Sequence, residues 1–178
     1  LGDRIRPYLG EDLPLIDEAV TIEHLLTHTG GLPAWINLYS AYDDVESRLA
    51  AVYDVAPTAP PGTEHVYSDL GLIVLGTIVE EVSGQPLEEY VAQHITGPLG
   101  MTDTMYDPPA ELRSRIAATE YQPLAGRGLV HGEVHDENAW ALGGVAGHAG
   151  VFATTDDVAV FAQMLLNGGT YDGARVLE

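Results

Sequence analysis

The side chains best suited by type and spacing to do chemistry lie in the triplet Tyr67-Ser68-Asp69. A phenol, a hydroxyl and a carboxylate follow one another here, just after a Pro/Gly-rich turn and just before an apolar stretch. A tyrosine oxygen can act as a base in acyl transfer where nearby positive charge lowers its pKa from about 10. We therefore predict that Tyr67, Ser68 and Asp69 are catalytic residues.

The apolar stretch after the triplet predicts a long buried helix over residues 70–84. Apolar residues recur at helical spacing along it, and Ser68 or Asp69 is a suitable N-cap. Gly84 can end the helix through a left-handed conformation. Gly71 and Gly76 inside the helix each cost about 1 kcal/mol relative to alanine, which is easier to explain if another backbone packs closely there. The triplet would then lie at the N-terminal end of a buried helix.

The rest of the chain predicts a mainly α protein with minor β pieces, organised as a single partial domain over residues 1–178. Residues 1–18 are expected to be an extended lead-in, residues 116–121 a short strand, and residues 122–150 a glycine-rich loop. Further helices are predicted over residues 21–28 (with Thr21 as N-cap), 43–53, 86–95 and 158–167.

Composition excludes several classes of function. Seven basic residues against 27 acidic ones give a formal net charge of −20, so nucleic acid and anionic membranes are poor partners. No run of 18 apolar residues occurs, which predicts no membrane span. All seven basic residues are arginine, and the absence of cysteine excludes disulfides and cysteine-ligated zinc. The first four residues lack the pattern of an export signal and read as a chain entered midway.

Two groups of histidines could bind a metal. His24 and His28 are four residues apart, but Leu25 stands where the H-E-x-x-H motif needs an acid, so we expect His28 to make a structural hydrogen bond. The second group is His131, His135 and His148, with Asp136, and a metal-dependent hydrolase that uses these three histidines stays open as an alternative. The glycines around them favour a loop lining a cleft, so the prediction is no metal and no cofactor.

Four stretches, in order along almost the whole chain, carry a family resemblance. They are Thr21 to Leu32 (similar to T-I-x-x-L-L-T-H-T-S-G-L, with Gly30 where serine is common), Tyr67-Ser68-Asp69 with its helix (similar to Y-S-N), Gly97 to Thr104 (similar to P-L-G-M-x-D-T) and Gly147 to Asp157 (similar to G-x-A-G-L-x-S-T-x-x-D). The chain resembles the serine β-lactamase-like hydrolases: class C β-lactamases, penicillin-binding D-Ala-D-Ala carboxypeptidases and related esterases.

The resemblance implies a division of labour among three elements. In this family the serine of S-x-x-K is acylated, the tyrosine of Y-x-N takes part in proton transfer, and a K-T-G or H-x-G strand holds the substrate carboxylate. Tyr67 matches the tyrosine, while Asp69 replaces the more usual asparagine and cannot donate an amide hydrogen. No S-x-x-K can exist without lysine, so that element is expected upstream of this stretch. His148-Ala149-Gly150 imitates H-x-G, which makes His148 and Gly150 candidate substrate-binding residues, although their context matches the earlier G-x-A-G-L segment.

The resemblance also implies that this chain is the helical portion of an α+β fold whose sheet comes from flanking segments. An apolar surface should then be bare, open to those segments or to self-association. The parent would act on a β-lactam, a D-Ala-D-Ala peptide or a small ester, would be exported or periplasmic, and this chain alone would be inactive. The remaining alternative is a non-catalytic binding or scaffold module of the same fold.

Overall fold

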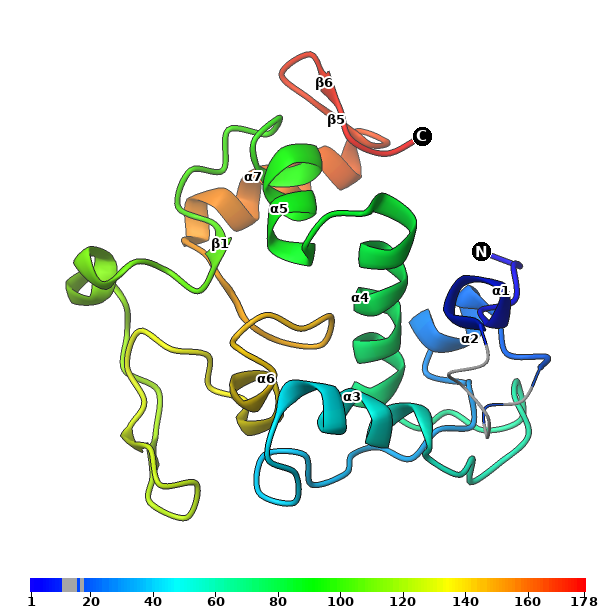
Figure 1. Cartoon of the computed structure of the whole chain (residues 1–178). Helices are drawn as coiled ribbons and strands as arrows, with labels where there is room; N and C mark the ends of the chain where they lie inside the picture. Colours follow the sequence, from blue (N-terminus) through cyan, green and yellow to red (C-terminus); the bar gives the residue numbers. More distant parts are fainter. Residues whose placement is uncertain (11–15, 17) are drawn as a thin grey trace.

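The computed structural model describes residues 1–10, 16 and 18–178 and shows short helices and loops arranged around one long central helix (Figure 1). The α-helices in this part of the chain are α1 (Arg6–Leu9), α2 (Ile22–Leu26), α3 (Val45–Tyr53), α4 (Asp69–Ser83), α5 (Leu87–Val91), α6 (Glu137–Ala141) and α7 (Thr155–Leu166). A π-helical segment, Ala92–Thr96, continues α5, and a 3-10 turn spans Ala110–Arg115.

The strands of the described residues are short and pair two by two, always antiparallel. The pairs are β1 (Met105–Tyr106) with β4 (Val151–Phe152), β2 (Tyr121–Gln122) with β3 (Gly128–Leu129), and β5 (Thr170–Tyr171) with β6 (Ala174–Arg175). The β1–β4 pair places Met105 opposite Phe152 and so joins two distant parts of the chain. The described chain is thus mainly α with minor β, as predicted.

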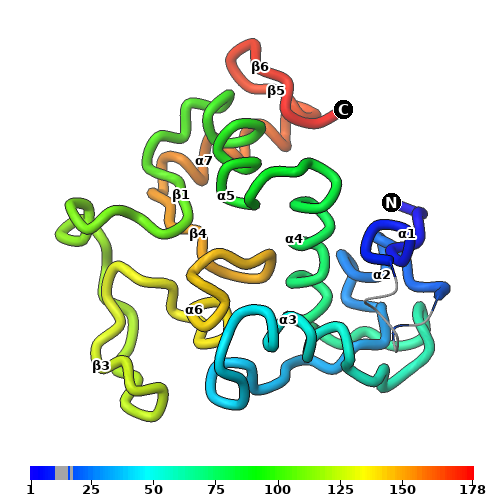
Figure 2. The backbone as a smooth tube through the Cα atoms, in the orientation of Figure 1, coloured from blue at the N-terminus to red at the C-terminus, as the bar shows by residue number. Residues whose placement is uncertain are grey.

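Helix α4 forms where the sequence predicts a long buried helix. Ser68 is its N-cap, because its Oγ accepts a hydrogen bond from the backbone N–H of Gly71 at 3.4 Å, and Gly84 ends it in the left-handed region at φ 67°. Its buried side includes Leu70, Val74 and Ile78. In both Figure 1 and Figure 2, α1 and α2 lie on one side of α4 and α5 lies near its far end.

The other predicted helices are confirmed, with three differences elsewhere. The predicted lead-in contains the single turn α1, with Pro7 in it and Leu9 buried, while residues 11–15 and 17 lie outside the described residues. The strand predicted over residues 116–121 begins only at Tyr121. The predicted loop 122–150 contains β3 and helix α6.

Buried apolar side chains form three clusters. The largest joins the N-terminal residues, α2, α3 and α4 through side chains such as Ile5, Leu25 and Val74. A second cluster packs Leu99 and Met101 against Met164 of α7. The third is small and lies around α6: Val134, Ala139 and Ala146.

No single helix among the described residues is long and apolar enough to cross a membrane. Only α4 and the helical segment that follows it, taken together, reach that length and composition, and they are bent by 76° relative to each other.

A buried amide ties α6 to the segment before α3. The Oδ1 of Asn138 accepts hydrogen bonds from the backbone N–H groups of Leu38 (3.0 Å) and Tyr39 (3.2 Å), and its Nδ2 donates to the carbonyl of Ile36 at 2.8 Å. Asn138 is fully buried. Its amide therefore replaces water for three backbone groups that no helix or strand satisfies.

We predict that Asn138→Ala lowers the free energy of unfolding by about 3 kcal/mol, because it leaves two buried or partly buried N–H groups and one carbonyl without partners. Urea unfolding followed by circular dichroism measures the loss. The matched control is Asn167→Ala at an exposed amide, which should change stability by no more than about 0.5 kcal/mol. Equal effects of the two variants would contradict the role given to Asn138.

The backbone of Gly147 packs directly on α4. A Cβ on Gly147 would overlap the carbonyl oxygen of Leu72, and a Cβ on Gly76 would lie 3.0 Å from the Gly147 nitrogen. The expected close backbone approach is therefore present at Gly76. At Gly71 a Cβ would meet only the Leu25 side chain and backbone, at 3.6 Å, which is an ordinary contact.

Gly71 in α4 and Gly147 in the loop packed on it should consequently respond in opposite directions to alanine. We predict that Gly71→Ala is neutral or stabilises the protein by up to about 1 kcal/mol through helix propensity. Gly147→Ala should destabilise it by about 2 kcal/mol, since two backbones cannot separate without losing their packing. Thermal unfolding of both variants tests this, and a destabilising Gly71→Ala would show that helix packing there is tighter than the contacts indicate.

Candidate active site

Hydrogen bonds from the α2 end hold the turn that carries the triplet. The backbone N–H of Ser68 donates to Nδ1 of His28 at 3.2 Å, and the N–H of Val66 donates to the His28 carbonyl at 2.9 Å. The Ser68 hydroxyl is buried and donates to the Pro33 carbonyl at 2.7 Å. The expected structural hydrogen bond of His28 is confirmed. A catalytic role for the Ser68 hydroxyl would require its cap and Pro33 contacts to open.

Tyr67 points away from the core. Its side chain is 65% exposed, and its ring lies against the His28 ring with 4.6 Å between centroids and 43° between planes. No hydrogen-bond partner for its hydroxyl is present among the described residues. The phenol is therefore free to contact a group that approaches the start of α4.

Asp69 is the first residue of α4, and its carboxylate faces two other titratable side chains. Its backbone N–H donates to the Ala34 carbonyl at 3.0 Å, while its half-buried carboxylate clusters with Asp136 and His148 within 4.8 Å. Burial raises the pKa of Asp69; His148 opposes this shift, the charge of Asp136 adds to it, and His28 opposes it more weakly. Asp69 thus belongs to a coupled acidic site.

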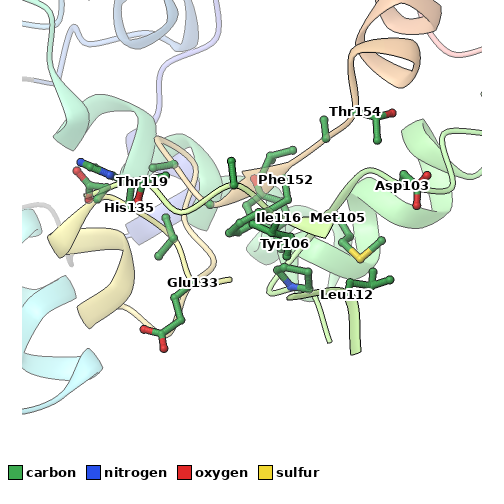
Figure 3. Close-up of a pocket in the computed structure, with 18 of the residues that line it drawn as sticks. Asp103, Met105, Tyr106, Leu112, Ile116, Thr119, Glu133, His135, Phe152 and Thr154 are labelled. Atoms are coloured by element: carbon green, nitrogen blue, oxygen red, sulfur yellow. The ribbon is translucent and has the colours of Figure 1, made fainter. Parts of the chain in front are cut away.

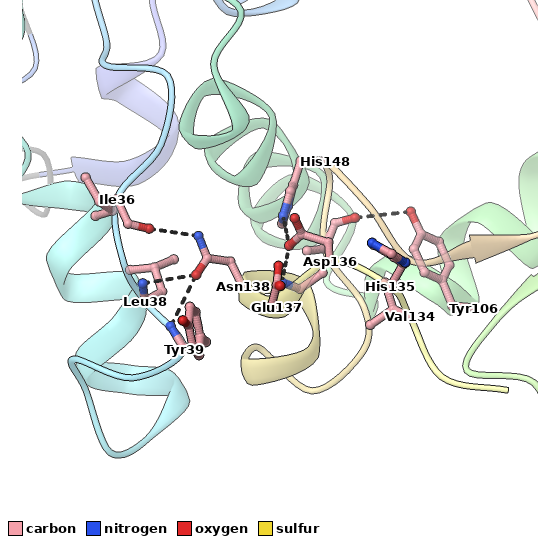
Figure 4. A network of polar contacts seen from close by, with 12 residues as sticks. Ile36, Leu38, Tyr39, Tyr106, Val134, His135, Asp136, Glu137, Asn138 and His148 are labelled. Carbon is pink, nitrogen blue, oxygen red and sulfur yellow. Dashed lines mark hydrogen bonds and ion pairs between the residues drawn. The ribbon is translucent and has the colours of Figure 1, made fainter. Parts of the chain in front are cut away.

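Asp136 and His148, the two neighbours of Asp69 in this site, contact each other (Figure 4). His148 Nε2 lies 2.9 Å from Asp136 Oδ1, which also accepts from the N–H of Ala139 at 2.7 Å and so caps α6. Burial raises the pKa of Asp136 most strongly, but hydrogen bonds from His148 and the backbone outweigh it, so the pKa is lowered overall. The His148 side chain is only 2% exposed.

A cavity of about 910 Å³ lies beside the cluster (Figure 3). His148 and Gly150, the predicted substrate-binding residues, both line it, as does Asp136. Figure 3 shows Tyr106, Ile116 and Phe152 grouped in its middle. Tyr67 and Asp69 do not line this cavity, so the two predicted sets of site residues meet only through the contact of Asp69 with His148.

The structure does not bring the three predicted metal-binding histidines together. His131 Nε2 lies 2.8 Å from the Ile116 carbonyl, and His135 pairs with Glu120 at 3.2 Å. Among the described residues, His148 joins the two carboxylates instead. His24 uses Nδ1 to accept from the Thr21 N–H in a capping box, so neither histidine of the first pair has both ring nitrogens free.

Two of the stretches that carry the family resemblance also meet each other. A carboxylate oxygen of Asp157, in α7, accepts from the N–H of Asp103 and from the hydroxyl of Thr104, both at 2.9 Å. Strand β1 follows Thr104 directly, and its partner β4 ends five residues before Asp157. These stretches are therefore structural: they fix the segment that closes one side of the cavity.

The roles of two site residues were not predicted. His28 supports the Tyr67 ring, a contact that no local pattern indicates. Asp136 caps α6, and this cap does have a sequence signal: an aspartate and a glutamate precede Asn138-Ala139-Trp140, with glycines at 143 and 144 after the turn.

Comparisons with known proteins identify the family of this chain. The family model described as Beta-lactamase matches residues 1–178, and the chain belongs to this family. A curated protein of Escherichia coli (strain K12), named "Putative D-alanyl-D-alanine carboxypeptidase", is 41% identical over 179 residues, covering 88% of this chain and 41% of that protein. A Salmonella agona protein of the same name is 34% identical, covering 99% of this chain and 44% of its own length. The chain therefore spans less than half the length of these relatives.

Solved structures show the same fold. A class C β-lactamase superposes with a TM-score of 0.74 at 20% identity, over 94% of this chain and 43% of that one. The β-lactamase/D-alanine carboxypeptidase of Pseudomonas syringae gives 0.71 at 22% identity, over 97% and 46%. This chain is thus the α-rich portion of the β-lactamase/penicillin-binding-protein fold, as the resemblance implies.

The geometry gives Ser68 a structural role and leaves the neighbouring Tyr67 side chain exposed. We predict that Ser68→Ala lowers the free energy of unfolding by about 2 kcal/mol, because it removes the α4 cap and the Pro33 contact. Tyr67→Phe should change it by no more than about 0.5 kcal/mol, because the lost hydroxyl is exposed and unpaired. Chemical denaturation of both variants separates the roles; a stable Ser68→Ala protein would remove the structural assignment.

Proposed function

We propose that this chain is one partial domain of a serine hydrolase of the β-lactamase/penicillin-binding-protein type, acting through an acyl-enzyme. Its substrates would be D-Ala-D-Ala peptides, with β-lactams or small esters as related acyl donors. The family membership and the names of the curated relatives support this class. The nucleophilic serine and its lysine would come from outside these residues, since the chain has no lysine, and the chain alone would be inactive.

The observation that carries the proposal is the exposed, unpaired phenol of Tyr67 on a rigid turn. Its backbone is fixed by the hydrogen bond from Ser68 to His28, and its ring by the His28 contact. Such a group is preorganised to accept and return a proton beside a nucleophile supplied by another segment. Asp69, two residues further along the chain, would bind a cationic group there instead of donating an amide hydrogen to substrate.

The exposed side of α7 supports the expected position of the missing segments. Val158, Phe161 and Leu165 recur at helical spacing and are all exposed, while Met164 of the same helix is fully buried against Leu99 and Met101. This face would pack against the sheet of the intact protein. Self-association through it is the second use of the same face; the penicillin-binding protein homologue of Pyrococcus abyssi, whose fold this chain shares, is described as octameric.

A metal-dependent hydrolase built on His131, His135 and His148 receives no support from the arrangement of these side chains. A non-catalytic module of the same fold remains the competing outcome of the experiment below.

The test is covalent labelling with a fluorescent penicillin and a fluorophosphonate, on this chain and on the longer protein encoded by the same gene. We predict label on the longer protein only, at a serine upstream of residue 1. Tyr67→Phe in the longer protein should slow labelling by about 100-fold, the usual effect of losing a general acid–base group. The matched control is Tyr121→Phe, whose side chain is 66% exposed and lies far from the triplet in sequence.

Each other outcome rejects part of the proposal. No label on either protein would favour the non-catalytic module. Label on this chain alone would place the nucleophile within it, with Ser68 as the first serine to replace. Equal slowing by the two tyrosine variants would remove the role given to Tyr67.

A further inference from the structure

We propose that His28 is a positioning residue for Tyr67, and that a histidine occupies this place for the reaction rather than for folding. The inference rests on the proposed function, because it takes from it the role of Tyr67 in proton transfer. Three observations carry it: the backbone conformation of His28, the hydrogen bonds that it accepts on both sides of Tyr67, and the contact between the two rings.

His28 occupies a backbone position that favours glycine. The chain leaves α2 through two hydrogen bonds, from the N–H of Thr29 to the His24 carbonyl at 2.8 Å and from the N–H of His28 to the Leu25 carbonyl at 3.2 Å. These bonds form a Schellman motif, and its left-handed residue is His28, at φ 56°. Glycine adopts this conformation without strain and asparagine tolerates it, whereas a larger side chain is less favourable. A strained residue of this kind points to a use outside the helix that it ends.

The backbone on both sides of Tyr67 is bonded to His28. The His28 carbonyl accepts a hydrogen bond from the N–H of Val66 at 2.9 Å, and Nδ1 of its ring accepts one from the N–H of Ser68 at 3.2 Å. Because a backbone N–H only donates, Nδ1 carries no proton, and the imidazole is the neutral tautomer with its proton on Nε2. A glycine at this place would suit the backbone but could not bind Ser68.

The ring of Tyr67 packs on the imidazole that Ser68 holds. The ring centroids are 4.6 Å apart and the planes meet at 43°. Since the Tyr67 side chain is otherwise mostly exposed among the described residues, this contact restricts the direction of its phenol. A group that transfers a proton must be held close to the productive geometry. The hydrogen bond thus fixes the imidazole, and the imidazole fixes the phenol.

A second histidine–tyrosine pair shows the same ring contact in an ordinary setting. His94 lies against Tyr90 with 4.5 Å between centroids and 37° between planes. The two residues are four positions apart in one helical stretch, where such contacts are expected, and His94 is exposed. His94 therefore provides a matched control for the removal of an imidazole from a tyrosine ring.

The test measures the rate at which the fluorescent penicillin labels the longer protein, in a double-mutant cycle. His28→Asn keeps a side-chain acceptor for Ser68 and tolerates the left-handed conformation, but it removes the ring. We expect it to slow labelling about tenfold. The Tm should stay within about 2 °C of the wild type, because relief of backbone strain offsets the lost ring contact. In a Tyr67→Phe background, His28→Asn should have no further effect, since His28 acts only through the phenol. His94→Asn should leave the rate unchanged.

A second variant and a measurement independent of activity support the cycle. His28→Gly suits the backbone but removes both the acceptor and the ring, so it should slow labelling by about 100-fold and provides the comparison if His28→Asn does not fold. Nitrogen-15 NMR of the same protein, labelled at histidine and measured at about pH 8, should show His28 with its proton on Nε2.

Several outcomes would overturn the inference while leaving the proposed function intact. They are independent effects of His28→Asn and Tyr67→Phe that multiply in the double variant, equal slowing by His94→Asn, a His28 ring protonated on Nδ1, and a fall in Tm that accounts for the slower labelling of His28→Asn. Absence of label on the wild-type longer protein would instead reject the proposed function, and this inference with it.

Discussion

The close approach of the Gly147 backbone to helix α4 is the contact on which the site depends. The loop lies against α4 between Leu72 and Gly76, where two backbones meet without side chains between them. Because Asp69 lies one helical turn before Leu72, the residue after Gly147 is brought to the level of the Asp69 carboxylate. That residue is His148. One packing contact therefore joins helix α4, which follows the triplet, to the loop that borders the cavity.

The polar groups that this contact brings beside α4 can be buried because most of them are hydrogen-bonded. A buried imidazole and two carboxylates are expensive to desolvate unless each is hydrogen-bonded or paired. Asp136 is satisfied twice, by His148 and by the α6 backbone. Asn138, also in α6, connects this helix to the chain before α3 through three further hydrogen bonds. The position of Asp136 is thus secured by the fold around it, whereas the carboxylate of Asp69 accepts no hydrogen bond from the described residues.

Local sequence patterns predicted most of the helices but not which side chains the fold brings into contact. The bounds and caps of α4 follow from Ser68, Gly84 and the apolar period between them, since these effects act within a few residues. Helix α6 is only five residues long, too short for its period to stand out from a glycine-rich loop. The pairing of His148 with Asp136 depends on the packing of the loop on α4. Sequence spacing alone cannot indicate this, and it grouped His148 with His131 and His135 instead.

The departure from the family pattern at Asp69 gains a physical reason from this arrangement. An asparagine there would offer the cluster an uncharged amide, whereas an aspartate places a second carboxylate beside a buried imidazole. Such a replacement lowers stability unless a cation is present to offset the added charge. Among the described residues, the side chains that act favourably on the Asp69 carboxylate are His148 and His28, and no arginine is among them.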